Sequence, residues 1–243
     1  AAGILMVTEI ELGDILVHVS QKDIKNVHLN VNPPDGRVRV SAPLHMNIDT
    51  IRAFVISKLE WIKRSQNKLR AQERETQREY IDRESHQVWG QRYSLQIVEL
   101  QAAPRVAVKY GSLVLQVRPG TARAKRQAVV AQWYRNQIKD AVPALIQKWA
   151  PLMGVNVKKV FVQQMKTRWG SCNPAAGNIR FNSELAKKPP ECLEYIVVHE
   201  MVHLLEPTHN QRFTALMDRF MPVWRNHRDE LNRLPVRQEH WVY

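Results

Sequence analysis

The stretch from residue 195 to residue 209 constrains this chain more than any other. It contains His199-Glu200-Met201-Val202-His203, and a third histidine, His209, follows six residues later. On a helix, residues four apart project from one face, one turn apart, so His199 and His203 can point toward one atom. Pro207 is expected to end the helix and turn the chain back, which makes His209 available as a third ligand.

These residue types fit a catalytic zinc site. Imidazole nitrogens bind zinc, and a catalytic site has three protein ligands and one open position for water. Glu200, next to the first histidine, can act as a general base toward that water. The alternative is a charged turn of an amphipathic helix. Apolar residues surround the motif, and burying two histidines and a glutamate without a partner is costly, so the pattern favours a metal.

The net charge of +13 is unevenly distributed, because residues 101–190 hold 16 Lys/Arg and only 2 Asp/Glu. A local basic excess attracts polyanions such as nucleic acid. A solubilising, solvated surface explains the same charge equally well. The candidate nucleic-acid contacts are basic residues of a predicted long helix: Arg123, Lys125, Arg126, Arg135 and Lys139.

Cysteine content and hydropathy bear on the compartment. The chain has two cysteines, Cys172 and Cys192, too few for a disulfide framework, and we therefore expect a cytoplasmic location. No apolar run approaches the roughly 20 residues that span a bilayer, so we expect no membrane span. The sequence leaves the oligomeric state undefined.

Hydrophobic periodicity predicts an α+β protein. Alternation over residues 5–42 predicts an N-terminal antiparallel β-meander, followed by a helix that begins near Ile51. Residues 93–117 predict a second β-rich unit. A long helix is predicted over residues 121–150, and Pro143 is expected to kink it or split it in two.

The C-terminal half holds the three candidate ligand histidines. Residues 157–164 and 178–182 predict a hairpin with a wide loop, which precedes the histidine helix. No internal repeat stands out. The predicted division is a β-meander plus helix over residues 1–85, a β-rich connecting unit over 86–120, and the histidine-bearing domain over 121–243.

Three motifs together resemble a known family. Lys-Thr-Arg-Trp-Gly-Ser-Cys at 166–172, Asn-Ile-Arg-Phe-Asn at 178–182 and the histidine stretch at 199–209 closely resemble the YgjP-like metallopeptidases, relatives of the SprT and WLM groups within the zincins. The resemblance covers most of the chain. It implies an α+β minimal zincin metallopeptidase core, Zn²⁺ as cofactor, the three histidines as zinc ligands and Glu200 as the catalytic acid/base. The family's better-known relatives are linked to proteolysis of proteins crosslinked to DNA.

Other residues are candidates for supporting roles. Glu206 is expected to orient a ligand histidine or to pair with Arg168, with a place as third zinc ligand as the alternative. In zincins a peptide usually lies along an edge strand above the metal helix; residues 178–182 or 160–164 are the candidates here. Tyr195 and His227 are conceivable oxyanion donors, a choice that the sequence leaves open.

Three functions follow from these features. The first is a zinc-dependent peptidase that acts on protein or peptide substrates, including DNA-associated proteins. The second is a metal-dependent hydrolase of nucleotide phosphoanhydrides, since cations and a metal stabilise phosphoryl charge; no glycine-rich phosphate loop supports it. The third is a nucleic-acid-binding module with a structural zinc, although structural sites usually close with four ligands.

Overall fold

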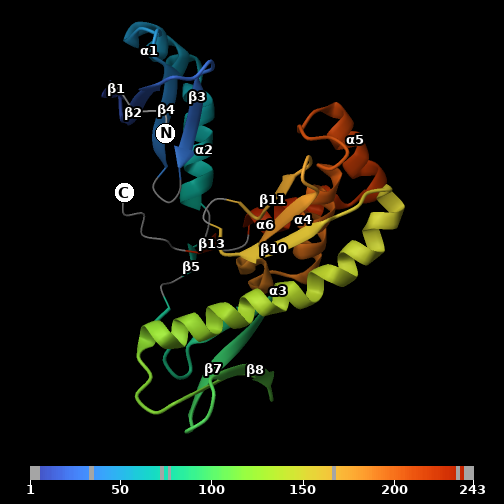
Figure 1. The fold of residues 1–243 in the computed structure, drawn as a ribbon. Helices are drawn as coiled ribbons and strands as arrows, with labels where there is room; N and C mark the ends of the chain where they lie inside the picture. Colours follow the sequence, from blue (N-terminus) through green and yellow to red (C-terminus); the bar gives the residue numbers. More distant parts are fainter. Residues whose placement is uncertain are drawn as a thin grey trace. The chain divides into compact units, whose positions relative to one another are not determined.

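The computed structural model describes residues 6–32, 36–71, 74–75, 78–165, 168–233 and 236–237. The chain separates into two compact units, one formed by residues 1–76 with 235–243 and the other by residues 77–234. Helices and mixed sheets occur in the chain (Figure 1), which confirms the predicted α+β class. The domain boundaries predicted at 85 and 120 stay a prediction.

The first unit is a four-stranded sheet with helices. In spatial order its strands are β1 (Met6–Leu12), β2 (Ile15–Lys22), β4 (Arg37–Pro43) and β3 (His28–Asn32). The inner strands β2 and β4 are parallel, and the two outer pairs are antiparallel. The sheet therefore differs from the predicted antiparallel meander in the pairing of β2 with β4. Two helices follow, α1 (Ile48–Ser57) and α2 (Leu59–Ala71). Short strands β5 (Arg74–Glu75) and β13 (Val236–Arg237) pair in parallel.

The second unit begins with a sheet of the same topology. Its strands in spatial order are β6 (Ser85–Val88), β7 (Gln91–Glu99), β9 (Ser112–Val117) and β8 (Arg105–Lys109), and the inner pair is again parallel. The turns at corresponding positions of the two sheets contain glycines with positive φ. Gly13 precedes β2 and Gly90 precedes β7, whereas Gly36 precedes β4 and Gly111 precedes β9. The topology is thus repeated, although the sequence shows no obvious repeat.

The long helix α3 (Arg123–Met153) is continuous through Pro143 and Pro151, so the predicted split does not occur. It ends at Gly154, which adopts a left-handed conformation with φ of 67°, a common helix stop. Its buried side chains belong to the same hydrophobic core as the sheet before it and the histidine helix after it: Val130, Tyr134, Ile138, Val142 and Met153.

A second sheet of three strands follows α3. In spatial order it contains β10 (Lys159–Gln163), β12 (Asn178–Asn182) and β11 (Gly170–Asn173). β10 and β12 are parallel, whereas β11 and β12 form the antiparallel hairpin. The predicted hairpin between residues 157–164 and 178–182 is therefore wrong. The tight turn at Gly177, with φ of 65°, joins β12 to the short strand just before it.

The remaining elements surround the histidine helix. They are the 3₁₀ helix η1 (Ser183–Lys187), α4 (Pro190–Val202), α5 (Gln211–Phe220) and α6 (Trp224–Arg233). Pro190 occupies the first turn of α4, a position that tolerates proline. Nine residues of α4 are buried, as expected for a helix packed on several sides. No helix in the described ranges is long and apolar enough to cross a membrane.

Candidate metal and active site

The three predicted ligand histidines lie together. Their candidate ligand atoms are all within 4.8 Å of one another, and Nε2 of His199 is 3.1 Å from Nε2 of His209. Two imidazole nitrogens on a tetrahedral zinc, each at about 2.0–2.1 Å from the ion, are about 3.3 Å apart. The donor set therefore fits a zinc ion. Nδ1 of His199, the ring nitrogen that takes no part in this approach, is buried with no hydrogen-bond partner in the described part of the chain.

The protonation state of the histidines suits metal binding. Burial, together with the neighbouring imidazoles of His203 and His209, lowers the pKa of His199 to about 3. Burial also lowers the pKa of His203. Nδ1 of His203 lies 3.1 Å from the backbone carbonyl of Glu206, and because a carbonyl only accepts, this nitrogen donates. The lone pair of neutral His203 is then on Nε2.

Glu206 supports the site in a different way from the one predicted. Its backbone carbonyl orients His203, whereas its carboxylate accepts hydrogen bonds from the backbone and hydroxyl of Thr208, at 3.2 and 2.9 Å. Among the described residues, the cation that pairs with this carboxylate is Arg212, at 3.9 Å, so the expected pairing with Arg168 is not observed. Glu206 instead holds the loop that carries His209, after α4 has ended at Val202.

Phe213 is a site residue that the sequence did not reveal. It is buried on α5, and its ring centroid lies 5.0, 4.7 and 4.7 Å from those of His199, His203 and His209. Asn210 begins α5 by accepting a hydrogen bond from the Phe213 backbone at 3.0 Å. This aromatic ring restricts all three imidazoles at once. The available signal was a large apolar residue four positions after His209.

Glu200 lies on α4 against strand β11. The residue is only 5% exposed, and burial raises the pKa of its carboxyl to about 8, an effect that the charge of Arg168 opposes. A Cβ atom on Gly170 would lie 2.6 Å from Oε1 of Glu200. Only glycine leaves room for the carboxyl there, so β11 and α4 fix the glutamate beside the histidines.

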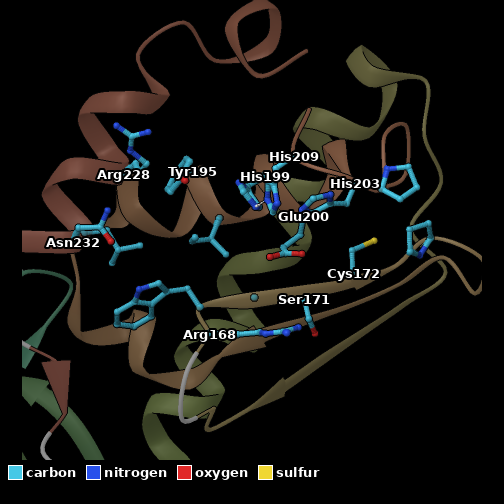
Figure 2. Close-up of a pocket in the computed structure, with 16 residues that line it drawn as sticks. Arg168, Ser171, Cys172, Tyr195, His199, Glu200, His203, His209, Arg228 and Asn232 are labelled. Carbon is cyan, nitrogen blue, oxygen red and sulfur yellow. Dashed lines mark hydrogen bonds between the residues drawn. The ribbon is translucent and has the colours of Figure 1, made fainter. Parts of the chain in front are cut away.

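A cleft with a volume of about 570 Å³ contains these groups. Figure 2 shows Glu200 and the histidines between Arg228 at one end and Cys172 at the other. Tyr195 lines the cleft and His227 does not; burial raises the pKa of Tyr195 to about 12, so its hydroxyl stays a potential donor. Burial and the charge of Glu200 raise the pKa of Cys172 to about 11, which keeps this thiol protonated near neutral pH.

Asn182 anchors the connection between β10 and β11. This buried amide donates to the backbone carbonyls of Met165 and Arg168, at 2.9 and 2.8 Å, and accepts from the backbone of Met165 and Glu184, at 3.2 and 3.1 Å. The backbone of Asn182 also donates to the carbonyl of Trp169 at 2.9 Å. One side chain thus fixes the chain that leads into the cleft wall.

Asn182→Ala is expected to lower the free energy of unfolding by about 2–3 kcal/mol, since buried backbone groups lose their partners. We also expect kcat/KM to fall about tenfold, because the segment that leads into β11 would no longer be held in position. Urea unfolding and steady-state kinetics measure the two effects. Asn178→Ala, at the other end of β12 and only partly buried, is the matched control; equal losses for both variants would contradict the anchoring role.

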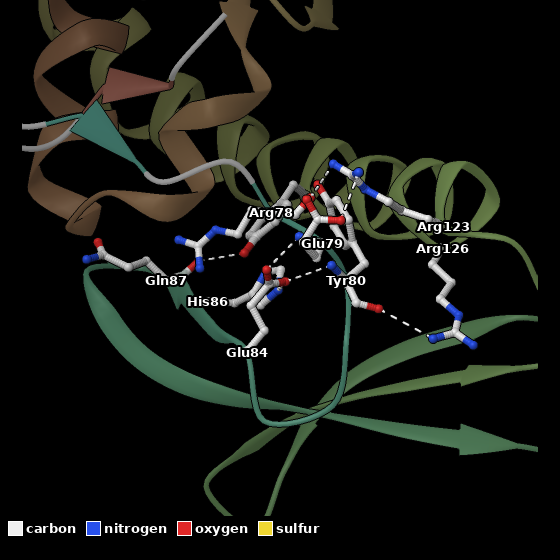
Figure 3. A network of polar contacts seen from close by, with 9 residues as sticks. Arg78, Glu79, Tyr80, Glu84, His86, Gln87, Arg123 and Arg126 are labelled. Atoms are coloured by element: carbon white, nitrogen blue, oxygen red, sulfur yellow. Dashed lines mark hydrogen bonds and ion pairs between the residues drawn. The ribbon is translucent and has the colours of Figure 1, made fainter.

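Two of the five predicted nucleic-acid contacts form ion pairs within the protein. Arg123 pairs with Glu79 at 2.8 Å and donates to the carbonyl of Arg78 at 3.0 Å. Arg126 pairs with Glu99 at 3.3 Å and donates to the carbonyl of Tyr80 at 3.5 Å. Figure 3 shows both arginines directed at the segment before β6.

Three predicted nucleic-acid contacts remain. Arg135 donates to Gln132 at 3.2 Å. Lys125 and Lys139 are exposed and have no ion-pair partner among the described residues. Two of the five candidate cations therefore hold α3 to the start of the second unit. Arg135, Lys125 and Lys139 have no ion-pair partner in the described part of the chain, and their contact with nucleic acid stays a prediction.

Four side chains in one cleft define a metallopeptidase-type site. They are two histidines and a glutamate at the C-terminal end of a buried helix, and a third histidine from the loop that follows it. The model of a family described as "YgjP-like, metallopeptidase domain" matches residues 25–234. The chain belongs to this YgjP-like family, and the family resemblance predicted from the sequence is confirmed.

Two solved structures are similar to parts of the chain. One is the metallopeptidase zymogen of Pyrococcus abyssi abylysin, with 21% identity, a TM-score of 0.35, and coverage of 39% of this chain and 99% of that one. The other is the metallopeptidase zymogen of Methanocaldococcus jannaschii jannalysin, with 22% identity, a TM-score of 0.31, and coverage of 39% and 88%. No curated protein matches the chain.

Proposed function

We propose that this protein is a zinc-dependent peptidase in which His199, His203 and His209 hold the metal and Glu200 transfers protons. The convergence of three imidazoles beside a buried carboxyl in one cleft carries this proposal. Zinc bound there would polarise the scissile carbonyl and lower the pKa of a water molecule. Membership of a metallopeptidase family supports the same assignment.

The protein's own groups divide the work of hydrolysis. Glu200 removes a proton from the attacking water and delivers it to the leaving amine nitrogen. Arg168 lines the cleft, and its positive charge already acts on Glu200. That charge also favours the negative charge that develops on the carbonyl oxygen.

Strand β11 is the edge on which we place the peptide. Among the described strands it pairs only with β12, and Gly170, Ser171 and Cys172 line the cleft. An extended peptide adds to such an edge through main-chain hydrogen bonds. The sequence-based choice of residues 178–182 is wrong, because β12 is the central strand. Strand β10, the other candidate, contributes no residue to the cleft lining.

The test is cleavage of a generic unfolded protein by zinc-loaded enzyme, metal-depleted enzyme and zinc-loaded Glu200→Gln. We expect fragments only from the zinc-loaded wild type. Fragments from all three samples would identify a contaminating protease, and their absence from clean, zinc-bound wild type would count against the proposal. Adding DNA tests its coupling to cleavage, and a steep loss of DNA affinity with salt is the sign of phosphate contacts.

A second candidate activity is hydrolysis of nucleotide phosphoanhydrides. The observation that favours it is that two guanidinium groups, those of Arg168 and Arg228, line the cleft that holds the histidines. Arginine is well suited to phosphate recognition. A panel of nucleoside triphosphates with phosphate and pyrophosphate detection tests this activity, and turnover no higher than that of Glu200→Gln would eliminate it.

A further inference from the structure

One end of the catalytic cleft is formed by α6, and we call it the α6 end. Arg228, Leu231 and Asn232 of that helix line the cleft. They are three and four residues apart, so they share one helix face. Tyr195 of α4 and Trp169, the residue before β11, line the cleft as well. In Figure 2, Arg228, Tyr195 and Asn232 lie together on one side of Glu200, opposite Cys172.

The α6 end combines an apolar lining with polar groups. Ile196, Leu231 and the rings of Trp169 and Tyr195 supply apolar surface, and Arg228 with Asn232 supplies hydrogen-bond donors. Pockets of this composition use apolar contact for affinity and a few polar groups to choose the ligand. Arg228 can only donate hydrogen bonds, so the group that it binds is a hydrogen-bond acceptor.

The charged side chains that line the cleft are mostly positive. Glu200 is the sole carboxylate among the described residues that line it, and it lies beside the histidines. Arg168 and Arg228 contribute two positive charges from different elements, the segment before β11 and helix α6. A cation in the histidine site would add to this positive potential. Negatively charged substrate groups are favoured in such a cleft and positively charged groups are disfavoured.

Arg228 is held in place yet keeps donors available. Its guanidinium lies 5.1 Å from the ring centroid of Trp224, which is buried and stacks on Tyr195 at 6.3 Å. Nε and one Nη group contact a single oxygen of Asp229, at 3.0 and 2.9 Å. The other Nη group has no hydrogen-bond partner among the described residues. Asp229 is not part of the cleft lining, so the arginine can also serve a ligand.

We propose that the α6 end binds a carboxylate of the peptide substrate through Arg228, so that the enzyme prefers substrates with an acidic group on that side of the scissile bond. This inference rests on the proposed peptidase function. Guanidinium groups pair with carboxylates through charge-assisted hydrogen bonds. The carboxylate comes from an Asp or Glu side chain or from the C-terminus of the peptide, and the experiment separates these two sources.

Binding is measured first, without turnover. Fluorescein-labelled peptides are titrated with zinc-loaded Glu200→Gln by fluorescence anisotropy. Four peptides of one parent sequence are used: a neutral amidated peptide, the same peptide with one internal Glu, the same with one internal Lys, and the neutral peptide with a free C-terminus. We expect one of the two carboxylate peptides to bind roughly tenfold more tightly than the neutral one, and the Lys peptide to bind most weakly.

Variants of α6 then assign the preference to Arg228. Adding Arg228→Gln should abolish the preference for the carboxylate peptide, and Arg228→Lys should restore part of it because the charge is kept. Arg233→Gln is the matched control, since this arginine belongs to the same helix and does not line the cleft. A preference that survives Arg228→Gln, or that Arg233→Gln removes equally, would overturn the assignment.

The same peptides offered to wild-type enzyme separate this inference from the proposed function. Cleavage of all peptides at equal kcat/KM would leave the peptidase intact and refute the carboxylate site. Carboxylate-selective binding that depends on Arg228, with no cleavage of any peptide, would support the site and count against the peptidase. Selective cleavage of the carboxylate peptide supports both.

Discussion

Glu200→Gln is expected to lower kcat for peptide cleavage by about 10²–10⁴-fold, the range that general acid–base catalysis contributes. Glutamine has the size of glutamate but cannot take up the proton of the attacking water. The substitution leaves the three histidines unchanged, so the fold and the metal site should persist. The measurement is kcat on a generic unfolded protein, with enzyme fully loaded with zinc.

Zinc content distinguishes a catalytic from a structural effect of this change. Glu200→Gln should bind zinc with the wild-type stoichiometry, because the carboxyl is not one of the three grouped ligands. His203→Ala should lose zinc and activity together. Wild-type kcat in zinc-loaded Glu200→Gln would show that another group transfers the proton, and loss of zinc from this variant would make the glutamate structural.

The grouping of the three histidines was predictable from sequence because it is mostly local. His199 and His203 are four residues apart on or beside one helix, and His209 follows within a short loop. The helix end was less predictable, since α4 stops at Val202, five residues before Pro207. Spacing along one helix therefore indicated which histidines meet, while the path of the loop depended on hydrogen bonds of Glu206.

The wall opposite the ligand helix could not be predicted in this way. Strand β11 has only four residues, Gly-Ser-Cys-Asn, with no alternation of apolar and polar side chains to mark it. Its partner is chosen by tertiary packing, and so is the parallel pairing of β10 with β12. The part of the wall that α6 supplies, including Arg228, comes from residues well after the histidines. No short-range pattern connects such distant segments.

Gly170→Ala is expected to lower kcat by about 10²-fold and the free energy of unfolding by about 1–3 kcal/mol, because the new methyl group overpacks a buried site. The new Cβ would lie 2.6 Å from Oε1 and 2.7 Å from Cγ of Glu200, so one of the two residues must move. The three nearest atoms all belong to the side chain of Glu200 and none to backbone, so we expect this side chain to be displaced from the histidines. Steady-state kinetics and urea unfolding measure the two quantities.

A double variant tests whether Gly170 acts through Glu200. If the alanine only displaces the side chain at position 200, adding Gly170→Ala to Glu200→Gln should cause little further loss, since the glutamine transfers no proton in either position. A full additional loss would mean that the alanine moves β11 itself and disturbs the edge on which the peptide is placed. Wild-type activity in the single variant would contradict the close approach of β11 to α4. Zinc stoichiometry should be unchanged throughout, because the three atoms nearest to the new methyl group all belong to Glu200, which is not one of the grouped histidines.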